Sequence, residues 1–99
     1  MDRRQSYLER VHQIVLQHLK GQPVRVYLFG SWVRGDAQRT SDIDIAILPF
    51  GPLPPGLLSH LQEALEESYV PYPIEMVDLS QTDVAFRRRV IEEGILWSD

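Results

Sequence analysis

The segment that decides the fold is GSWVRGDAQRTSDID, residues 30–44. It opens with Gly30-Ser31, directly after a β-branched and aromatic run, and closes with Asp42-Ile43-Asp44 at the start of a second apolar run. A glycine at a strand end lets backbone amides approach a phosphate closely, and a serine hydroxyl adds a further donor. The pattern predicts two strands joined by a short segment, with a phosphate-binding turn after the first strand.

The second strand, predicted from Ser41 to Leu48, carries two carboxylates on one face. Side chains alternate along a strand, so Asp42 and Asp44 share a face, and the three isoleucines between and after them share the other. The aspartates are about 6.6 to 6.8 Å apart along the strand. Aspartate is depleted in strands, and two on one face repel unless a cation lies between them. Magnesium, which takes few carboxylates plus phosphate oxygens and water, fits this pair.

A third carboxylate is expected from Asp78, near the end of a strand predicted from Tyr72 to Leu79. It would complete a second metal site and accept a proton from an attacking hydroxyl. Regular alternation places Asp78 on one face of this strand and Glu75 on the opposite, solvent-facing side. Asp78 could instead cap the turn that follows. Trp32 has two interpretations, stacking on a base or packing against the sheet, and packing is the commoner one.

The rest of the chain supplies the helices of one α/β (α+β) domain that spans residues 1–99. The predicted elements are a helical stripe from Arg3 to Lys20 stopped by Gly21, a strand over 24–29, a proline-rich and glycine-rich loop over 49–56, a helical stripe over 57–69, a helix from a capping-box-like Ser80-Gln81-Thr82-Asp83 to about Glu93, and a short strand over 95–97.

Composition limits the class of protein. With 99 residues, of which 43% are hydrophobic and 24% charged, the chain is expected to form a single soluble domain. The absence of cysteine excludes disulfides and thiolate metal sites. No apolar run is long enough to span a bilayer, and the first residues lack the apolar core of a signal peptide. These features predict a cytoplasmic protein that does not enter a membrane.

The net charge and the size of the chain indicate which partners it binds. The formal net charge of −4 argues against a protein that holds nucleic acid stably by neutralising phosphates. The run Arg87-Arg88-Arg89 is either a solvated helix face or a docking surface for an acidic partner. So small a domain tends to leave apolar surface exposed, so a homo-oligomer or a heteromeric complex is expected.

Taken together, these residues resemble the nucleotidyltransferase superfamily that includes DNA polymerase beta, and in particular its minimal nucleotidyltransferases. The family pattern is Gly-Ser, ten residues, then Asp-x-Asp, and residues 30–44 match it. The context of the small branch is also present: Phe29 before the glycine, Arg34-Gly35 after it, Thr40-Ser41 before the aspartates and Val77-Asp78-Leu79 later.

The resemblance implies a nucleotidyltransferase fold, a small mixed β-sheet flanked by helices. It also implies two Mg²⁺ ions bound by the catalytic carboxylates Asp42, Asp44 and Asp78, and ATP as substrate. The nucleotide would be held by Gly30, Ser31, Arg34 and Ser41. The spacing that leads to Asp78 is not fixed in the family pattern.

Minimal nucleotidyltransferases of this size resemble the antitoxin of a type VII-like toxin–antitoxin pair whose toxin is a HEPN ribonuclease. The resemblance implies transfer of AMP (AMPylation) from ATP to a tyrosine of that partner. Two alternatives stay open: a non-catalytic antitoxin that inhibits by contact, and nucleotide transfer to RNA or to a small hydroxylated molecule. The residues leave open which triphosphate is used, the acceptor, the oligomeric state and the role of the arginine run.

Overall fold

The computed structural model describes residues 3–34 and 42–97. Its elements, in chain order, are α1 (Arg3–Leu19), β1 (Val24–Phe29), α2 (Ser31–Arg34), β2 (Ile43–Pro49), α3 (Leu57–Glu66), β3 (Ile74–Asp78), the 3₁₀ helix η1 (Leu79–Gln81), α4 (Val84–Glu93) and β4 (Ile95–Leu96). The order agrees with the sequence prediction, and most boundaries shift by only a few residues.

The four strands form one mixed sheet in the order β3-β2-β1-β4. Strand β1 runs antiparallel to both β2 and β4, whereas β2 and β3 run parallel. The parallel pair is joined through α3, since two parallel strands need a crossover connection between them. The predicted fold, a small mixed sheet flanked by helices, is confirmed.

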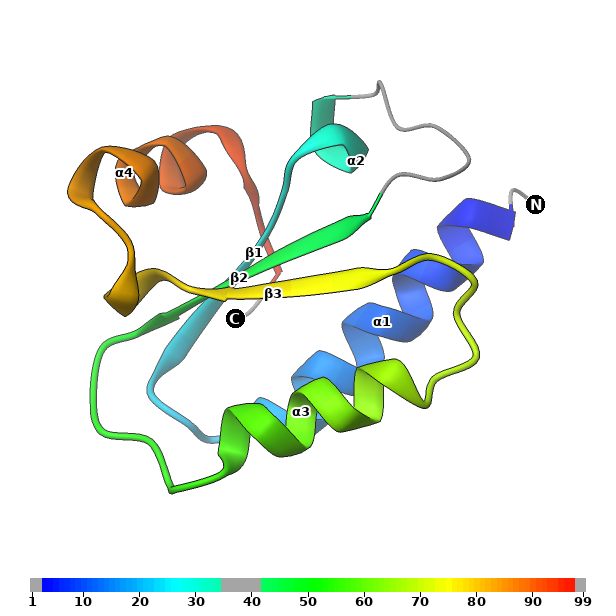
Figure 1. Cartoon of the computed structure of the whole chain (residues 1–99), viewed down its shortest axis with the longest axis horizontal. Coiled ribbons are helices and arrows are strands. Elements are labelled where there is room, and N and C mark those ends of the chain that lie inside the picture. Colours follow the sequence, from blue (N-terminus) through cyan, green and yellow to red (C-terminus); the bar gives the residue numbers. More distant parts are fainter. Residues whose placement is uncertain (1–2, 35–41, 98–99) are drawn as a thin grey trace.

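Helices α1 and α3 cover one face of the sheet and α4 covers part of the other (Figure 1). The main core lies under α1 and α3, where Ile43, Ile45 and Ile47 of β2 are each 0% exposed. A smaller apolar cluster under α4 contains Tyr27, Ala46, Leu79 and Val90. The alternation predicted for β2 is thus confirmed, and it directs Asp44 to the face that carries α4.

Trp32 of α2 packs against the main core, as the commoner interpretation of this residue expected. Its ring meets Tyr72 edge-on, with the ring centroids 4.9 Å apart. The guanidinium carbon of Arg4 lies 5.8 Å from the Trp32 ring centroid, within cation–π range. These contacts fix α2, and with it the turn at Gly30, against the N-terminal end of α1.

Helix α3 ends at Glu66, so the prediction that the helical stripe continues to Tyr69 is wrong. The Ser68 hydroxyl donates a 2.6 Å hydrogen bond to the Leu65 carbonyl, and the backbone leaves the helix there. Tyr69 has φ +62° and its side chain is 94% exposed. Side-chain bonds from serine to nearby backbone compete with helical ones, which explains the early stop.

Helix α4 begins at Val84, and its N-cap is Asp83, whose carboxylate accepts a 2.8 Å hydrogen bond from the Phe86 backbone N–H. The predicted start at Ser80 is three residues too early because residues 79–81 form η1 instead. Asp83 therefore sets the position of Phe86, which contacts the edge of Phe29 under the helix.

Replacing Asp83 with alanine is expected to lower the free energy of unfolding by about 1 kcal/mol, since the cap to the Phe86 N–H is lost. Urea denaturation followed by circular dichroism measures this difference. Asp83→Asn is the matched control, because asparagine caps a helix about as well as aspartate. An equal loss in the asparagine variant would show that the charge, and not the cap, matters.

Within the part of the chain that the structure describes, no helix combines the length and the apolar character needed to cross a membrane.

Candidate active site

Gly30 stands at the turn between β1 and α2, and its backbone has φ +82°. Its carbonyl accepts the N–H groups of Val33 and Arg34 at 3.0 and 3.1 Å, which closes the turn. A Cβ at this position would overlap the Asp44 carboxylate. Glycine is required at this position for two reasons: the backbone is left-handed there, and it approaches Asp44 too closely for a Cβ.

Asp44 lies where three elements meet. In the antiparallel register it faces Phe29, and in the parallel register it faces Glu75. Residues paired in register point to the same side of a sheet, so Asp44 and Glu75 share the face that carries α4. The sheet thereby brings together two carboxylates from adjacent strands, next to the Gly30-Ser31 turn.

Electrostatic coupling supports this grouping. The pKa of Asp44 rises from its ordinary value of 3.8 to about 6, first because the group is partly buried, then because Glu75 and Asp42 place negative charge nearby. Arg34 acts in the opposite direction and lowers this pKa. Three carboxylates and one guanidinium therefore interact at this end of the sheet, and the carboxylates repel one another.

Asp78 does not belong to this group, contrary to the sequence prediction. Its register partner is Ile47, so it lies on the opposite face of the sheet from Asp44, at the far end of β3. Its carboxylate accepts hydrogen bonds from the Ser80 backbone N–H (2.9 Å) and the Ser80 hydroxyl (2.7 Å), capping η1. The capping interpretation is the one that the structure supports, and Glu75 occupies the place expected for Asp78.

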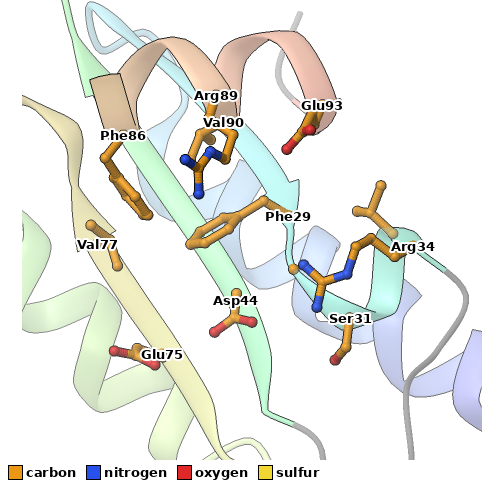
Figure 2. A pocket seen from close by; sticks show the side chains of 12 residues that line it. Phe29, Ser31, Arg34, Asp44, Glu75, Val77, Phe86, Arg89, Val90 and Glu93 are labelled. Atoms are coloured by element: carbon orange, nitrogen blue, oxygen red, sulfur yellow. The ribbon is translucent and has the colours of Figure 1, made fainter. Parts of the chain in front are cut away.

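The carboxylates open onto a cavity of about 430 Å³, within the range of small-molecule sites (Figure 2). It lies between α2 and α4, over the sheet. Its lining consists of Phe29, Gly30, Ser31, Val33, Arg34, Asp44, Glu75, Val77, Phe86, Arg89, Val90 and Glu93. Of the predicted site residues it contains Gly30, Ser31, Arg34 and Asp44.

Of the other predicted residues, Asp42 lies close to this group without lining the cavity. It precedes β2, is exposed and contributes to the raised pKa of Asp44. Ser41 lies outside the described residues. Glu75, Phe86 and Arg89 were not predicted to belong to the site. For Glu75, the sequence signal was a carboxylate at an alternate position of a predicted strand.

The donor set is sparse for a metal. Within residues 3–34 and 42–97, no three histidine, cysteine or acidic side chains are placed to hold an ion without other ligands. Asp44 and Glu75, with Asp42 beside them, nevertheless fit Mg²⁺, which typically binds one or two carboxylates and takes its remaining ligands from substrate phosphates and water. The mutual repulsion of these groups is what a bound cation would relieve.

The raised pKa of Asp44 predicts a pH-dependent stability of the ligand-free protein. A carboxyl group with pKa 3.8 unfolded and about 6 folded binds its proton more tightly in the folded state. The free energy of unfolding therefore falls as pH rises through that interval, and stays lower above it. Asp44→Asn removes the charge, so we expect it to stabilise the protein by about 1 kcal/mol near pH 7.5, after allowance for solvent screening.

Thermal unfolding without magnesium, near pH 4 and near pH 7.5, measures this effect. A gain of about 1 kcal/mol in the free energy of unfolding corresponds to a rise of about 4 to 8 °C in Tm for a domain of this size. We expect the gain near pH 7.5 and almost none near pH 4, where Asp44 is protonated in the folded state. The same gain at both pH values would show that its origin is not the carboxylate charge.

Comparison with known proteins agrees with this geometry. The sequence profile of the family described as "Polymerase beta, Nucleotidyltransferase" matches residues 10–98. The chain is 39% identical over 62 residues to the probable protein adenylyltransferase MntA of Haemophilus influenzae, an alignment that covers 63% of this chain and 54% of that protein. The chain thus spans about half the length of that curated relative.

Two solved structures are similar in fold and sequence. A crystal structure of a toxin–antitoxin with AMP-PNP contains a chain 27% identical to this one, with a TM-score of 0.66, over 87% of this chain and 71% of the other. A candidate minimal nucleotidyltransferase is also 27% identical, with a TM-score of 0.71, over 96% of this chain and 95% of the other. Because the family profile matches residues 10–98, nearly the whole chain, the chain belongs to the polymerase beta nucleotidyltransferase family.

Proposed function

We propose that the chain is a Mg²⁺-dependent adenylyltransferase that transfers AMP from ATP to a tyrosine hydroxyl of a HEPN-type toxin, and so acts as the antitoxin of a type VII-like pair. The observation that carries this proposal is the convergence of Asp44 and Glu75 beside the Gly30-Ser31 turn, in one cavity of nucleotide-binding size. Phosphoryl and nucleotidyl transfer need little more from a protein than positioning and charge.

The triphosphate is assigned to the α2 end of the cavity. Gly30 brings backbone close to the carboxylates, Ser31 offers a hydroxyl, and Arg34 places a guanidinium near Asp44. Arginine matches phosphate oxygens with a planar pair of donors. Ser41 remains a proposed contact from the sequence pattern. These groups would orient the β- and γ-phosphates so that pyrophosphate leaves away from the acceptor.

Asp44 and Glu75, with Asp42, would hold the metal. Bound there, Mg²⁺ would polarise the α-phosphate and neutralise the charge that develops on its oxygens. In the transfer itself, the acceptor oxygen bonds to the α-phosphorus, the bond to the bridging β-phosphate oxygen breaks, and pyrophosphate departs. Glu75, the exposed carboxylate beside Asp44, would take the proton of the hydroxyl.

The similar proteins support the choice of acceptor and partner. The Haemophilus influenzae relative is a probable protein adenylyltransferase, which supports AMP transfer to a protein. The toxin–antitoxin structure with AMP-PNP supports an ATP-like nucleotide and a toxin partner. We therefore propose a heteromeric complex with the toxin, in the cytoplasm where ATP is available, without stable binding of nucleic acid.

Transfer of label from α-labelled ATP tests this function. The wild-type chain is incubated with magnesium and the co-expressed partner, and the products are separated by size. We expect label on the partner protein, removed by mutation of its acceptor tyrosine to phenylalanine. Label on RNA or on a small molecule would show that the acceptor is not a protein. A tight complex without any label would instead support inhibition of the partner by contact.

A further inference from the structure

The three consecutive arginines of α4 do not all face the same way. Successive residues of a helix point about 100° apart. Arg87 and Arg88 both line an outer groove with Val84 and Ile91, and the Arg87 Nε also donates a 3.0 Å hydrogen bond to the Leu79 carbonyl. Only Arg89 lines the cavity that contains Asp44. Arg87 and Arg88 therefore lie on the outer side of the helix and Arg89 on its cavity side, so the run does not form a single face.

Arg89 points from α4 toward Phe29, on the side of the cavity away from α2 (Figure 2). Phe86 and Val90 stand beside it on the same helix, and together these three residues form what we call the α4 wall. The wall faces Phe29 and Val77 of the sheet, and Phe29 meets Phe86 edge-on at 5.9 Å between ring centroids. This part of the cavity is mostly apolar and aromatic, and its charged groups are the Arg89 guanidinium and, farther along α4, the Glu93 carboxylate.

The charge of Arg89 does not act on the ionisation of Asp44. Arg34 lowers the pKa of Asp44, whereas Arg89 is not among the groups that shift it. Across the stretches 3–34 and 42–97, no side chain or carbonyl forms a hydrogen bond or an ion pair with Arg89. A guanidinium that lines the cavity and has no such partner is available to a ligand.

We propose that Arg89 binds the nucleobase of the triphosphate by stacking its guanidinium on the ring, and thereby favours purine nucleotides. This inference rests on the proposed function, which places the phosphates at α2. A phosphate would be poorly solvated between Phe29, Phe86 and Val77, but a flat base buries its faces there. Guanidinium groups stack on aromatic planes, and purines offer a larger plane than pyrimidines.

The test separates the base from the phosphates. Isothermal titration calorimetry with magnesium measures the affinity of the full chain for ATP, UTP and inorganic tripolyphosphate, which has no base. We expect Arg89→Ala to weaken ATP binding about fivefold to tenfold and UTP binding less, with tripolyphosphate unchanged. Arg34→Ala should weaken all three ligands. Arg88→Ala, on the outer side of the same helix, is the matched control and should change none.

Four results would overturn the inference. Equal losses for ATP and tripolyphosphate in Arg89→Ala would make Arg89 a phosphate ligand. Unchanged ATP binding together with a raised KM for the protein acceptor would assign the α4 wall to the acceptor. Wild-type chain that binds neither ATP nor tripolyphosphate would reject the proposed function as well, whereas binding of tripolyphosphate without any preference for ATP would reject only the base site.

Discussion

Replacement of Asp44 by asparagine is expected to reduce AMP transfer by about a thousandfold or more. The change keeps the size of the side chain but removes the charge that would hold Mg²⁺ against the α-phosphate, a contribution of several kcal/mol to the barrier. The fold should survive, because loss of this charge is expected to stabilise the ligand-free protein. The initial rate of label transfer from α-labelled ATP at saturating nucleotide measures the effect.

Asp78→Asn is the control for this prediction. Asparagine can still cap η1 through its side-chain oxygen, so neither stability nor transfer should change much. Wild-type activity in Asp78→Asn, alongside the loss in Asp44→Asn, would support the assignment of the site to the α4 face of the sheet. A comparable loss in both variants would contradict the assignment made from the register of β2 and β3.

Glu75→Gln is expected to slow transfer about a hundredfold at neutral pH. Glutamine keeps the shape of the side chain but cannot accept the proton of an attacking hydroxyl, and general base catalysis typically contributes 10² to 10⁴. A purely structural role would instead lower the free energy of unfolding of the variant. Measurement of kcat in the presence of magnesium, together with urea denaturation, distinguishes the two.

Glu66→Gln is a matched control on α3. Glu66 is exposed, and its carboxylate accepts a hydrogen bond from the Gln62 side chain of the same helix. Its transfer rate and its free energy of unfolding should equal those of the wild type. If Glu75→Gln behaved like Glu66→Gln, the carboxylate of Glu75 would have no part in the reaction, and the correction of Asp78 to Glu75 would fail.

Local pattern predicted those parts of the site that lie within one strand or turn. The alternation around Ile43 and Ile45 was sufficient to place Asp44 on the face away from the core, and the Gly30-Ser31 pair marked the turn. Both depend on the two-residue period of a strand and on the conformational freedom of glycine. Neither requires knowledge of a distant neighbour.

The third carboxylate could not be predicted in the same way. The alternation of Ile74, Met76 and Asp78 was correct, but which face of β3 meets Asp44 depends on the register of two strands joined by a crossover. A shift of one residue exchanges the faces. The arginine run presented a similar problem, since only the packing of α4 on the sheet decides which of three arginines enters the cavity.

The parallel pairing of β2 with β3 also affects the order in which the molecule acquires its chemistry. Asp44 and Glu75 belong to strands separated by the whole of α3, so no hairpin or other local fragment contains both. Contacts between residues distant in sequence require closure of a long loop, which slows folding. Catalytic activity should therefore recover during refolding only when β2 has paired with β3. We expect this recovery to follow the recovery of the helical circular dichroism signal.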